Sequence, residues 1–134
     1  MEIYPQVSGT ISVLKVKEGE KVKKGQSLFV IDQVPYQAAL RTAIANVHAA
    51  EAQVETARLD YDSKRILFDE KVISEYDLST AKNALSIAKA NLEQARAQET
   101  DARNNLSYTE VHSPADGVVG TLPFRAGALV GPSI

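Results

Sequence analysis

Two long stretches of the sequence carry apolar residues at alternating steps of three and four. The first runs from residue 35 to 68 and the second from 75 to 107. This is the spacing of coiled-coil a and d positions, so each stretch predicts an α-helix with one apolar seam. Larger residues alternate with alanine, which would let two helices approach closely, and Lys64 and Glu99 interrupt the seams. The seam residues are Tyr36, Leu40, Ala43, Val47, Ala50, Val54, Ala57, Tyr61 and Phe68 in the first helix, and Leu78, Ala81, Leu85, Ala88, Leu92, Ala95, Ala102 and Leu106 in the second.

The break between these helices is short. It covers residues 69–74, and Ser74 followed by Asp77 resembles a capping box at the start of the second helix. Pro35 suits the start of the first helix, where its missing N–H costs nothing. Each helix would be about 50 Å long at about 1.5 Å per residue. Similar lengths and a short break predict an antiparallel two-helix coiled-coil hairpin over residues 33–107, with polar faces opposite the seams.

Short alternating patterns of another kind flank the hairpin, in residues 6–32 and 108–134. Val7, Gly9 and Ile11 alternate with polar residues, which is typical of a half-buried strand. Glycine follows at the places where turns are expected, as in Glu18-Gly19-Glu20, because it adopts positive φ without steric cost. Each segment therefore predicts short strands joined by tight turns.

The two flanking segments share one spacing pattern. Shifted by about 108 positions, they match in residue type at five places, as a repeat search shows. Each half alone has too little apolar surface to offset the entropy of ordering it, so the halves should share one core. We therefore predict an α+β chain: a β-sandwich split at its midpoint, with the hairpin inserted. The matched positions are Gly9 with Gly117, Ile11 with Val119, Val16 with Phe124, Gly19 with Gly127, and Val22 with Val130.

The composition argues against several classes of function. The net charge is −2, with 15 basic and 17 acidic residues well mixed, whereas nucleic-acid binding usually needs a basic face. Cysteine is absent, so a disulfide framework, a thiolate metal site and a thiol nucleophile are excluded. No run of about 18 apolar residues predicts a membrane-spanning helix. The sequence starts almost inside its first strand pattern, stops at Gly131-Pro132-Ser133-Ile134 and has no tail at either end, so we expect a piece of a longer protein.

No residue pattern points to catalysis, a metal or a cofactor. His48 and His112 have no further ligand at the spacing that metal sites need. No phosphate-loop pattern accompanies the glycines. Acidic residues gather near the break between the helices, where a solvated surface explains them better than paired catalytic carboxylates, which need a cleft. These acidic residues are Asp60, Asp62, Asp69 and Glu70.

The two β-segments resemble the halves of a biotinyl/lipoyl domain. In a carrier domain of that family, a tight hairpin joins the halves and presents a lysine. Here the same place holds Ile31-Asp32-Gln33-Val34 and leads into a helix, so the resemblance implies the fold without the carrier lysine. The motifs that carry the resemblance are Val7-Ser8-Gly9, Glu18-Gly19-Glu20-Lys21-Val22 and Lys24-Gly25-Gln26-Ser27-Leu28 in the first half, and Ser113-Pro114-Ala115-Asp116-Gly117-Val118-Val119-Gly120 and Gly127-Ala128-Leu129-Val130 in the second.

The order of half-lipoyl segment, helical hairpin and second half-lipoyl segment resembles the periplasmic adaptor family, also called membrane fusion proteins. The stretch Leu106–Pro114 is similar to the family's return from the hairpin to the second half. The family's hairpin tip carries an arginine, a leucine four residues later and a serine seven beyond that. Leu67 and Ser74 match the leucine and the serine, whereas Ser63 stands at the arginine position and Arg65 lies two residues later.

This resemblance implies an adaptor of a tripartite multidrug efflux system of the resistance-nodulation-division (RND) type. Such adaptors lie in the periplasm of Gram-negative bacteria, associate with the inner membrane, and form a ring that commonly has six copies. Their hairpin tips contact a TolC-like outer-membrane channel, and domains outside this chain would bind the inner-membrane pump. The residues expected to bind the channel are Leu67, Ser74, Val72, Ile73 and Arg65.

Three alternatives stay open at this point. An adaptor of an ABC-type exporter or secretion system would have the same architecture and often a longer hairpin. A biotin or lipoyl carrier domain of an enzyme complex would share the β-fold. A plain coiled-coil interaction module would explain the seams but not the split β-segments.

Overall fold

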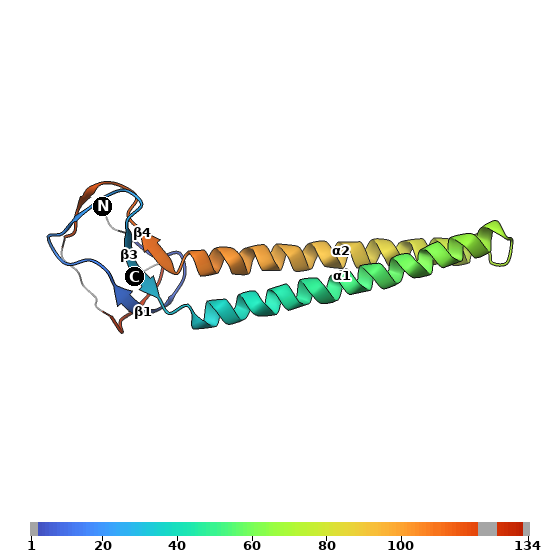
Figure 1. Cartoon of the computed structure of the whole chain (residues 1–134), viewed down its shortest axis with the longest axis horizontal. Coiled ribbons are helices and arrows are strands. Elements are labelled where there is room, and N and C mark those ends of the chain that lie inside the picture. Colours follow the sequence, from blue (N-terminus) through green and yellow to red (C-terminus); the bar gives the residue numbers. More distant parts are fainter. Residues whose placement is uncertain (1–2, 121–125, 133–134) are drawn as a thin grey trace. The chain divides into compact units, whose positions relative to one another are not determined.

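The computed structural model describes residues 3–120 and 126–132 of the chain. It confirms the α+β class, with two long helices between two sets of short strands (Figure 1). The chain divides into two compact units. A β-unit contains the residues up to Leu40 and from Ala102 onward, and a helical unit contains Arg41–Asp101. The elements are β1 (Gly9–Leu14), β2 (Lys21–Val22), β3 (Ser27–Ile31), α1 (Val34–Asp69), α2 (Glu75–Ser107), β4 (Glu110–His112), β5 (Gly117–Val118) and β6 (Leu129–Val130).

Strands from the two halves of the β-unit pair with each other. β1 pairs antiparallel with β6, and β2 pairs antiparallel with β5, so each of these pairings joins one strand from each half. The 108-residue shift found in the sequence converts one pairing into the other, residue by residue. The facing residues are Gly9–Val130 and Thr10–Leu129 in the first pairing, and Gly117–Val22 and Val118–Lys21 in the second.

Backbone hydrogen bonds beyond these strands follow the same symmetry. The Ile11 amide donates to a carbonyl in the turn before β6, and the Ile11 carbonyl accepts from the amide of the residue just before that one; Val119 does the same in the turn before β2. Gly19 and Gly127 have φ angles of 81° and 93°, which explains glycine at both turns. The match of Val16 with Phe124 lies outside the described residues. The four bonds, each 2.8 Å from nitrogen to oxygen, run from Ile11 to Ala128, Gly127 to Ile11, Val119 to Glu20 and Gly19 to Val119.

The strands form one four-stranded sheet, in the order β4-β3-β1-β6, and one two-stranded sheet of β2 and β5. Ile11, Ile31 and Val130 are the most deeply buried apolar residues of this core. β3 leads into α1, and β4 follows α2. These two strands are neighbours, with Val30 opposite Glu110. The chain therefore leaves and re-enters the sheet at adjacent strands, so a helical insertion leaves the pairing intact.

In the helical unit, α1 and α2 run side by side in opposite directions (Figure 1). Sequence patterning placed the helices at residues 35–68 and 75–107, and the structure has Val34–Asp69 and Glu75–Ser107. All predicted seam residues are buried or half-buried, and so are the two interrupting residues, Lys64 and Glu99. The buried seam residues are Ala43, Val47, Ala50 and Val54 on α1, and Ala81, Leu85, Ala88, Leu92 and Ala95 on α2.

The polar side chains expected away from the seams are exposed, among them Glu55 and Arg58 on α1 and Lys89 and Arg96 on α2. Six charged residues, three from each helix, line one groove between the helices. The groove is lined by Glu51, Val54, Glu55, Arg58, Lys89, Leu92, Glu93 and Arg96.

The close approach of β1 and β3 generates the first prediction. A Cβ added at Gly9 would lie 2.6 Å from Cγ2 of Ile31, a side chain with no exposed surface. Because Ile31 cannot retreat from the packed core, Gly9→Ala should lower the free energy of unfolding of the β-unit by about 1–3 kcal/mol. Urea denaturation, with hydrogen exchange of the β1 and β3 amides to isolate this unit, measures the change.

The repeat supplies the matched control. At Gly117, the counterpart of Gly9, an added Cβ meets no described atom within 4 Å. Gly117→Ala should therefore change the free energy of unfolding by less than about 0.5 kcal/mol. Equal losses at the two glycines would contradict the packing of Gly9 against Ile31.

Candidate functional site

At the hairpin tip, α1 ends in a Schellman motif centred on Lys71. This residue has a φ angle of 63°. Its amide donates to the Phe68 carbonyl at 2.9 Å, and the Val72 amide donates to the Leu67 carbonyl at 2.8 Å. The two bonds satisfy carbonyls that the last helical turn leaves without partners. Glycine is the usual residue at such a position, because a left-handed conformation costs other residues about 1–2 kcal/mol.

The start of α2 is capped by Ser74. Its Oγ accepts a hydrogen bond from the Asp77 amide at 3.2 Å, and its carbonyl accepts from the Leu78 amide at 3.2 Å. Ile73 and Leu78 are half-buried and occupy the two positions of a hydrophobic staple. The tip is therefore ordered by caps on both helices, with only a small apolar contribution from its own side chains.

The five predicted tip residues differ in exposure. Val72, Ser74 and Arg65 are exposed, whereas Leu67 and Ile73 are half-buried. Leu67 and Val72 stand at the two positions of the Schellman motif where a hydrophobic contact is common. The local fold thus accounts for Leu67, Ile73 and Ser74. It also favours an apolar residue at Val72, but it leaves 64% of that side chain exposed.

Arg65 lies on a different face of α1 from Ser63, because residues two apart are about 200° apart around a helix. Arg65 therefore does not take the place of the arginine in the tip motif. Ile66 and Tyr76, next to the tip, are 60% and 77% exposed and were not among the five predicted contact residues. Their position opposite the seam was the available signal, since an apolar side chain there has no core to enter.

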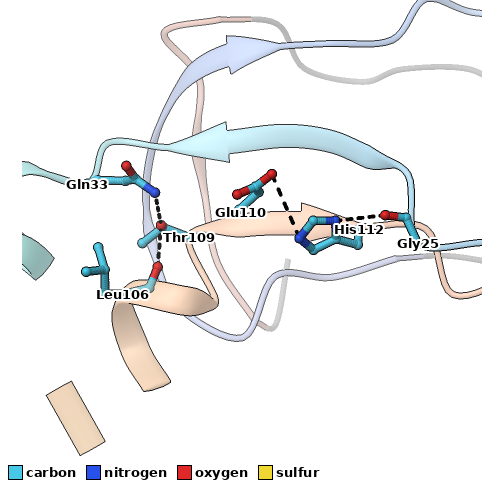
Figure 2. Close-up of polar contacts among 6 residues, drawn as sticks. All are labelled: Gly25, Gln33, Leu106, Thr109, Glu110 and His112. Carbon is cyan, nitrogen blue, oxygen red and sulfur yellow. Dashed lines mark hydrogen bonds and ion pairs between the residues drawn. The ribbon is translucent and has the colours of Figure 1, made fainter. Parts of the chain in front are cut away.

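Thr109, which the sequence did not single out, joins the bases of both helices to the sheet (Figure 2). Its side chain is fully buried. Oγ1 donates to the Leu106 carbonyl at 2.6 Å and accepts from Nε2 of Gln33 at 2.9 Å. The Thr109 carbonyl accepts from the Ile31 amide at 2.7 Å. One residue thereby fixes the start of α1, the end of α2 and strand β3.

The place where a carrier domain presents its lysine is occupied by the start of α1. β3 ends at Ile31, and Oδ1 of Asp32 accepts from the Val34 amide at 3.1 Å as the helix begins. No lysine stands between Ile31 and Val34. The segment is therefore built to begin a helix.

The two histidines are not arranged for chemistry. Nδ1 of His112 lies 3.1 Å from the Gly25 carbonyl oxygen and so carries the hydrogen of that bond (Figure 2). Nε2 lies 3.9 Å from the Glu110 carboxylate, and both side chains are about half exposed. His48 is exposed on α1. Within residues 3–120 and 126–132, no group of three or more side chains could hold a metal ion. None of the helices in that part is long and apolar enough to cross a membrane.

Comparison with known proteins was made on sequence and on structure. The family described as RND MFP (membrane fusion protein), barrel-sandwich hybrid domain, matches residues 1–133. The multidrug efflux pump subunit AcrA of Escherichia coli K12 is 36% identical over 129 residues, covering 96% of this chain and 32% of that protein. The antibiotic efflux pump periplasmic linker protein ArpA of Pseudomonas putida is 37% identical over 129 residues, covering 96% and 31%. The chain spans about a third of the length of these relatives.

Solved structures agree in fold. MacA from Actinobacillus actinomycetemcomitans is 35% identical with a TM-score of 0.70, covering 96% of this chain and 44% of that chain. The membrane fusion protein Spr0693 from Streptococcus pneumoniae R6 has a TM-score of 0.72 at 22% identity, over 92% of this chain and 52% of that one. The second likeness concerns the fold alone.

The left-handed backbone of Lys71 generates the second prediction. Glycine has no Cβ to strain this conformation, so Lys71→Gly should raise the free energy of unfolding of the helical unit by up to about 1 kcal/mol. Thermal melting followed by helical circular dichroism measures it. The control is Lys82→Gly, an exposed mid-helix site on α2, which should lose about 1 kcal/mol. A loss at Lys71 similar to that at Lys82 would refute the tip geometry.

The buried hydroxyl of Thr109 generates the third prediction. Thr109→Val keeps the shape but leaves the Leu106 carbonyl and the Gln33 amide without this partner, which should cost about 1–3 kcal/mol. Urea denaturation, with hydrogen exchange at the Ile31 amide, measures the loss. Thr100→Val removes a similar bond to the Arg96 carbonyl at an exposed site and should change stability by less than about 0.5 kcal/mol. Equal effects would show that the Thr109 hydroxyl has no special role.

Proposed function

This chain belongs to the RND membrane fusion protein family, and on that premise we propose that it is the hairpin-bearing part of a periplasmic adaptor. In the proposed system, the adaptor bridges an inner-membrane RND pump and a TolC-like outer-membrane channel for multidrug efflux. Its contribution is mechanical: it positions and seals the other components without bond chemistry or a cofactor.

The observation that carries the proposal is the capped tip with an exposed apolar residue. Two helix caps fix the loop between Asp69 and Glu75, and they hold Val72 in solvent at 64% exposure. An ordered apolar group at the end of a hairpin is suited to insertion between partner helices, because little entropy is left to lose on binding. The Schellman motif itself favours an apolar residue at Val72, and the exposed part of this side chain is the surface available for the channel.

Each predicted tip residue then has a proposed role. Val72 makes the principal apolar contact with the channel, and the half-buried Leu67 and Ile73 support it from below. Ser74 caps α2 and presents its hydroxyl at the surface. Arg65, exposed one helical turn before the end of α1, offers an ionic contact from the side of the hairpin.

The remaining parts of the proposal concern the whole protein. The adaptor works in the periplasm, and the full-length protein is associated with the inner membrane. Domains outside this chain bind the pump, and several copies, commonly six in the family, form a ring around the transport path. The names of the efflux-pump relatives, which include periplasmic linker proteins, support this assignment.

Among the alternatives, an ABC-type exporter would differ in the pump, which contacts other parts of the protein. A carrier role has no support at the junction of β3 and α1, where the required lysine is lacking. A plain coiled-coil module leaves the split β-unit without a purpose.

The tip proposal generates the fourth prediction. Val72→Asp places a charge where an apolar contact is expected, so binding to a purified TolC-type channel should weaken at least tenfold, which corresponds to about 1.4 kcal/mol. Folding should be unaffected, because the side chain is exposed. The dissociation constant on immobilised channel measures the effect. The control, Asn91→Asp, adds the same charge on an exposed part of α2 away from the tip. Unchanged binding by Val72→Asp would refute docking through the tip.

Ser74 needs a separate comparison, because capping alone would explain this residue. Ser74→Ala removes the cap and should cost about 1 kcal/mol of stability, whereas Ser74→Asn keeps a capping side chain. We expect Ser74→Asn to melt like the native chain and to bind the channel more weakly. Native-like binding by this variant would restrict Ser74 to capping.

A further inference from the structure

Lys71 has a backbone conformation that a residue with a Cβ disfavours. Among residues 3–120 and 126–132, it is the only residue other than glycine with a positive φ angle, 63°. It lies in the turn between α1 and α2 (Figure 1), at the position of the Schellman motif where glycine is usual. Strain of this kind persists where the surrounding structure or a function requires it. A lysine at this position therefore needs a cause that outweighs the strain.

The contacts of the turn do not provide that cause. The two hydrogen bonds of the motif are donated by the main-chain amides of Lys71 and Val72, so they do not depend on either side chain. The ammonium group of Lys71 forms neither a hydrogen bond nor an ion pair with any residue in the part of the chain that the structure describes. The residue is exposed. Glycine would satisfy every contact that the fold requires here.

The dipole of α1 does not provide the cause either. The C-terminal end of a helix favours cations, yet the last turn of α1 contains no basic residue. Asp69 and Glu70, the two residues before Lys71, are acidic instead. An order that served stability would place the lysine at one of these two positions, where φ is negative, and a glycine at position 71. The chain has the reverse order, so local stability does not explain the lysine.

Lys71 stands beside the residue on which the proposed docking depends. Val72 follows it in the chain and is 64% exposed. When this valine enters a partner, the neighbouring ammonium group would lie at the rim of the buried contact. An ammonium group has three N–H donors and no acceptor, so its partner must be an oxygen with full or partial negative charge. Carboxylates have this chemistry, and so do the carbonyls at the C-terminal ends of helices.

We propose that Lys71 is kept in its strained conformation because its ammonium group donates hydrogen bonds to an oxygen acceptor at the periplasmic end of the channel. This inference rests on the proposed docking of the tip and adds a residue with a different role. Val72 contributes apolar burial, which slows dissociation of the complex. Lys71 contributes a charge at the rim, which affects the association rate and the choice of partner more than the affinity.

The acidic residues of the tip make this cation important. Residues 69–77 contain four acidic residues and one lysine, which gives the segment a net charge of −3. Without Lys71, this segment would only repel an oxygen acceptor on a partner. A channel with no acceptor opposite Lys71 would leave the ammonium group without a partner on binding, which is costly. The same residue therefore discriminates between channels. The acidic residues are Asp69, Glu70, Glu75 and Asp77.

Association kinetics with an immobilised TolC-type channel test the proposal. Lys71→Gln removes the charge and keeps an unbranched side chain at the strained position. In about 0.1 M salt, where the Debye length is about 10 Å, its association rate should fall about threefold to tenfold, and its dissociation rate should change less. The difference should shrink in about 1 M salt, where the Debye length is about 3 Å. Lys71→Arg keeps the charge and should associate like the native chain.

Two controls separate this charge from the backbone strain and from the total charge. Lys71→Gly removes the charge and the strain together, so it should melt at a higher temperature than the native chain and yet associate as slowly as Lys71→Gln. Lys89→Gln removes the same charge at an exposed site on α2, about 21 Å from the start of that helix, and should leave association unchanged.

Four outcomes would each overturn the proposal. Lys71→Gln could associate like the native chain, or faster than it. Lys71→Arg could lose as much as Lys71→Gln. Lys89→Gln could show an equal loss, which would indicate an effect of total charge.

Variants of the channel identify the acceptor. The aspartates and glutamates at its periplasmic end are replaced by their amides. If the acceptor is a carboxylate, the difference between the native chain and Lys71→Gln should disappear. A difference that persists assigns the acceptor to helix-end carbonyls. Both results support donation by Lys71 and differ only in the source of the oxygen.

The failure of this inference can be distinguished from the failure of the proposed function. Val72→Asp tests docking through the tip itself. If Val72→Asp weakens binding while Lys71→Gln associates like the native chain, docking stands and the role of Lys71 is overturned. If neither variant differs from the native chain, both proposals are overturned.

Discussion

The pairing of strands from one half of the β-unit with strands from the other half is the constraint on which the rest of the structure depends. Gly9 pairs with Val130 and Gly117 pairs with Val22, so each half completes its ladder only with the other. A half in isolation would lose the pairing of β1 with β6 and of β2 with β5, and unpaired backbone groups are costly once buried. The two ends of the inserted hairpin are therefore tied through a module that forms only when both halves are present.

This constraint also explains why the insertion is tolerated. β3 and β4 are adjacent in the sheet, so the chain can leave after Ile31 and return before Glu110 without loss of a ladder. Residues at the base of the inserted hairpin hold its two ends in place. Buried there, Thr109 bonds to residues before α1 and at the end of α2, and its carbonyl bonds to β3. A buried hydroxyl with both donor and acceptor satisfied gives this junction a defined geometry, which an apolar residue of the same size would not.

Much of this fold follows from the sequence because the signals are local or repeated. The heptad seams predicted both helices, and their alanine and larger residues are buried or half-buried in the structure. The glycine repeat predicted a shared core. It could not show which strands pair, because a repeat shows that two segments are equivalent but does not identify the strand that each one pairs with. Ser74 indicated the cap of α2, whereas the Schellman motif was hidden by a lysine at the position where glycine gives the signal. Thr109 was hidden because two of its partners, Ile31 and Gln33, lie far away in sequence. Docking of the tip stays a prediction, since it depends on a second molecule.

The alanine-rich seam links the stability of the hairpin to its assembly. Each alanine in the seam buries less apolar surface than a leucine would, and apolar burial contributes about 25 cal/mol per Å². The hairpin therefore gains thin helices and close packing at the expense of internal stabilisation. Leu59 and Ile87 are apolar side chains that remain exposed in the single hairpin. Burial of these two side chains against a partner would recover part of the free energy that the alanine-rich seam does not provide.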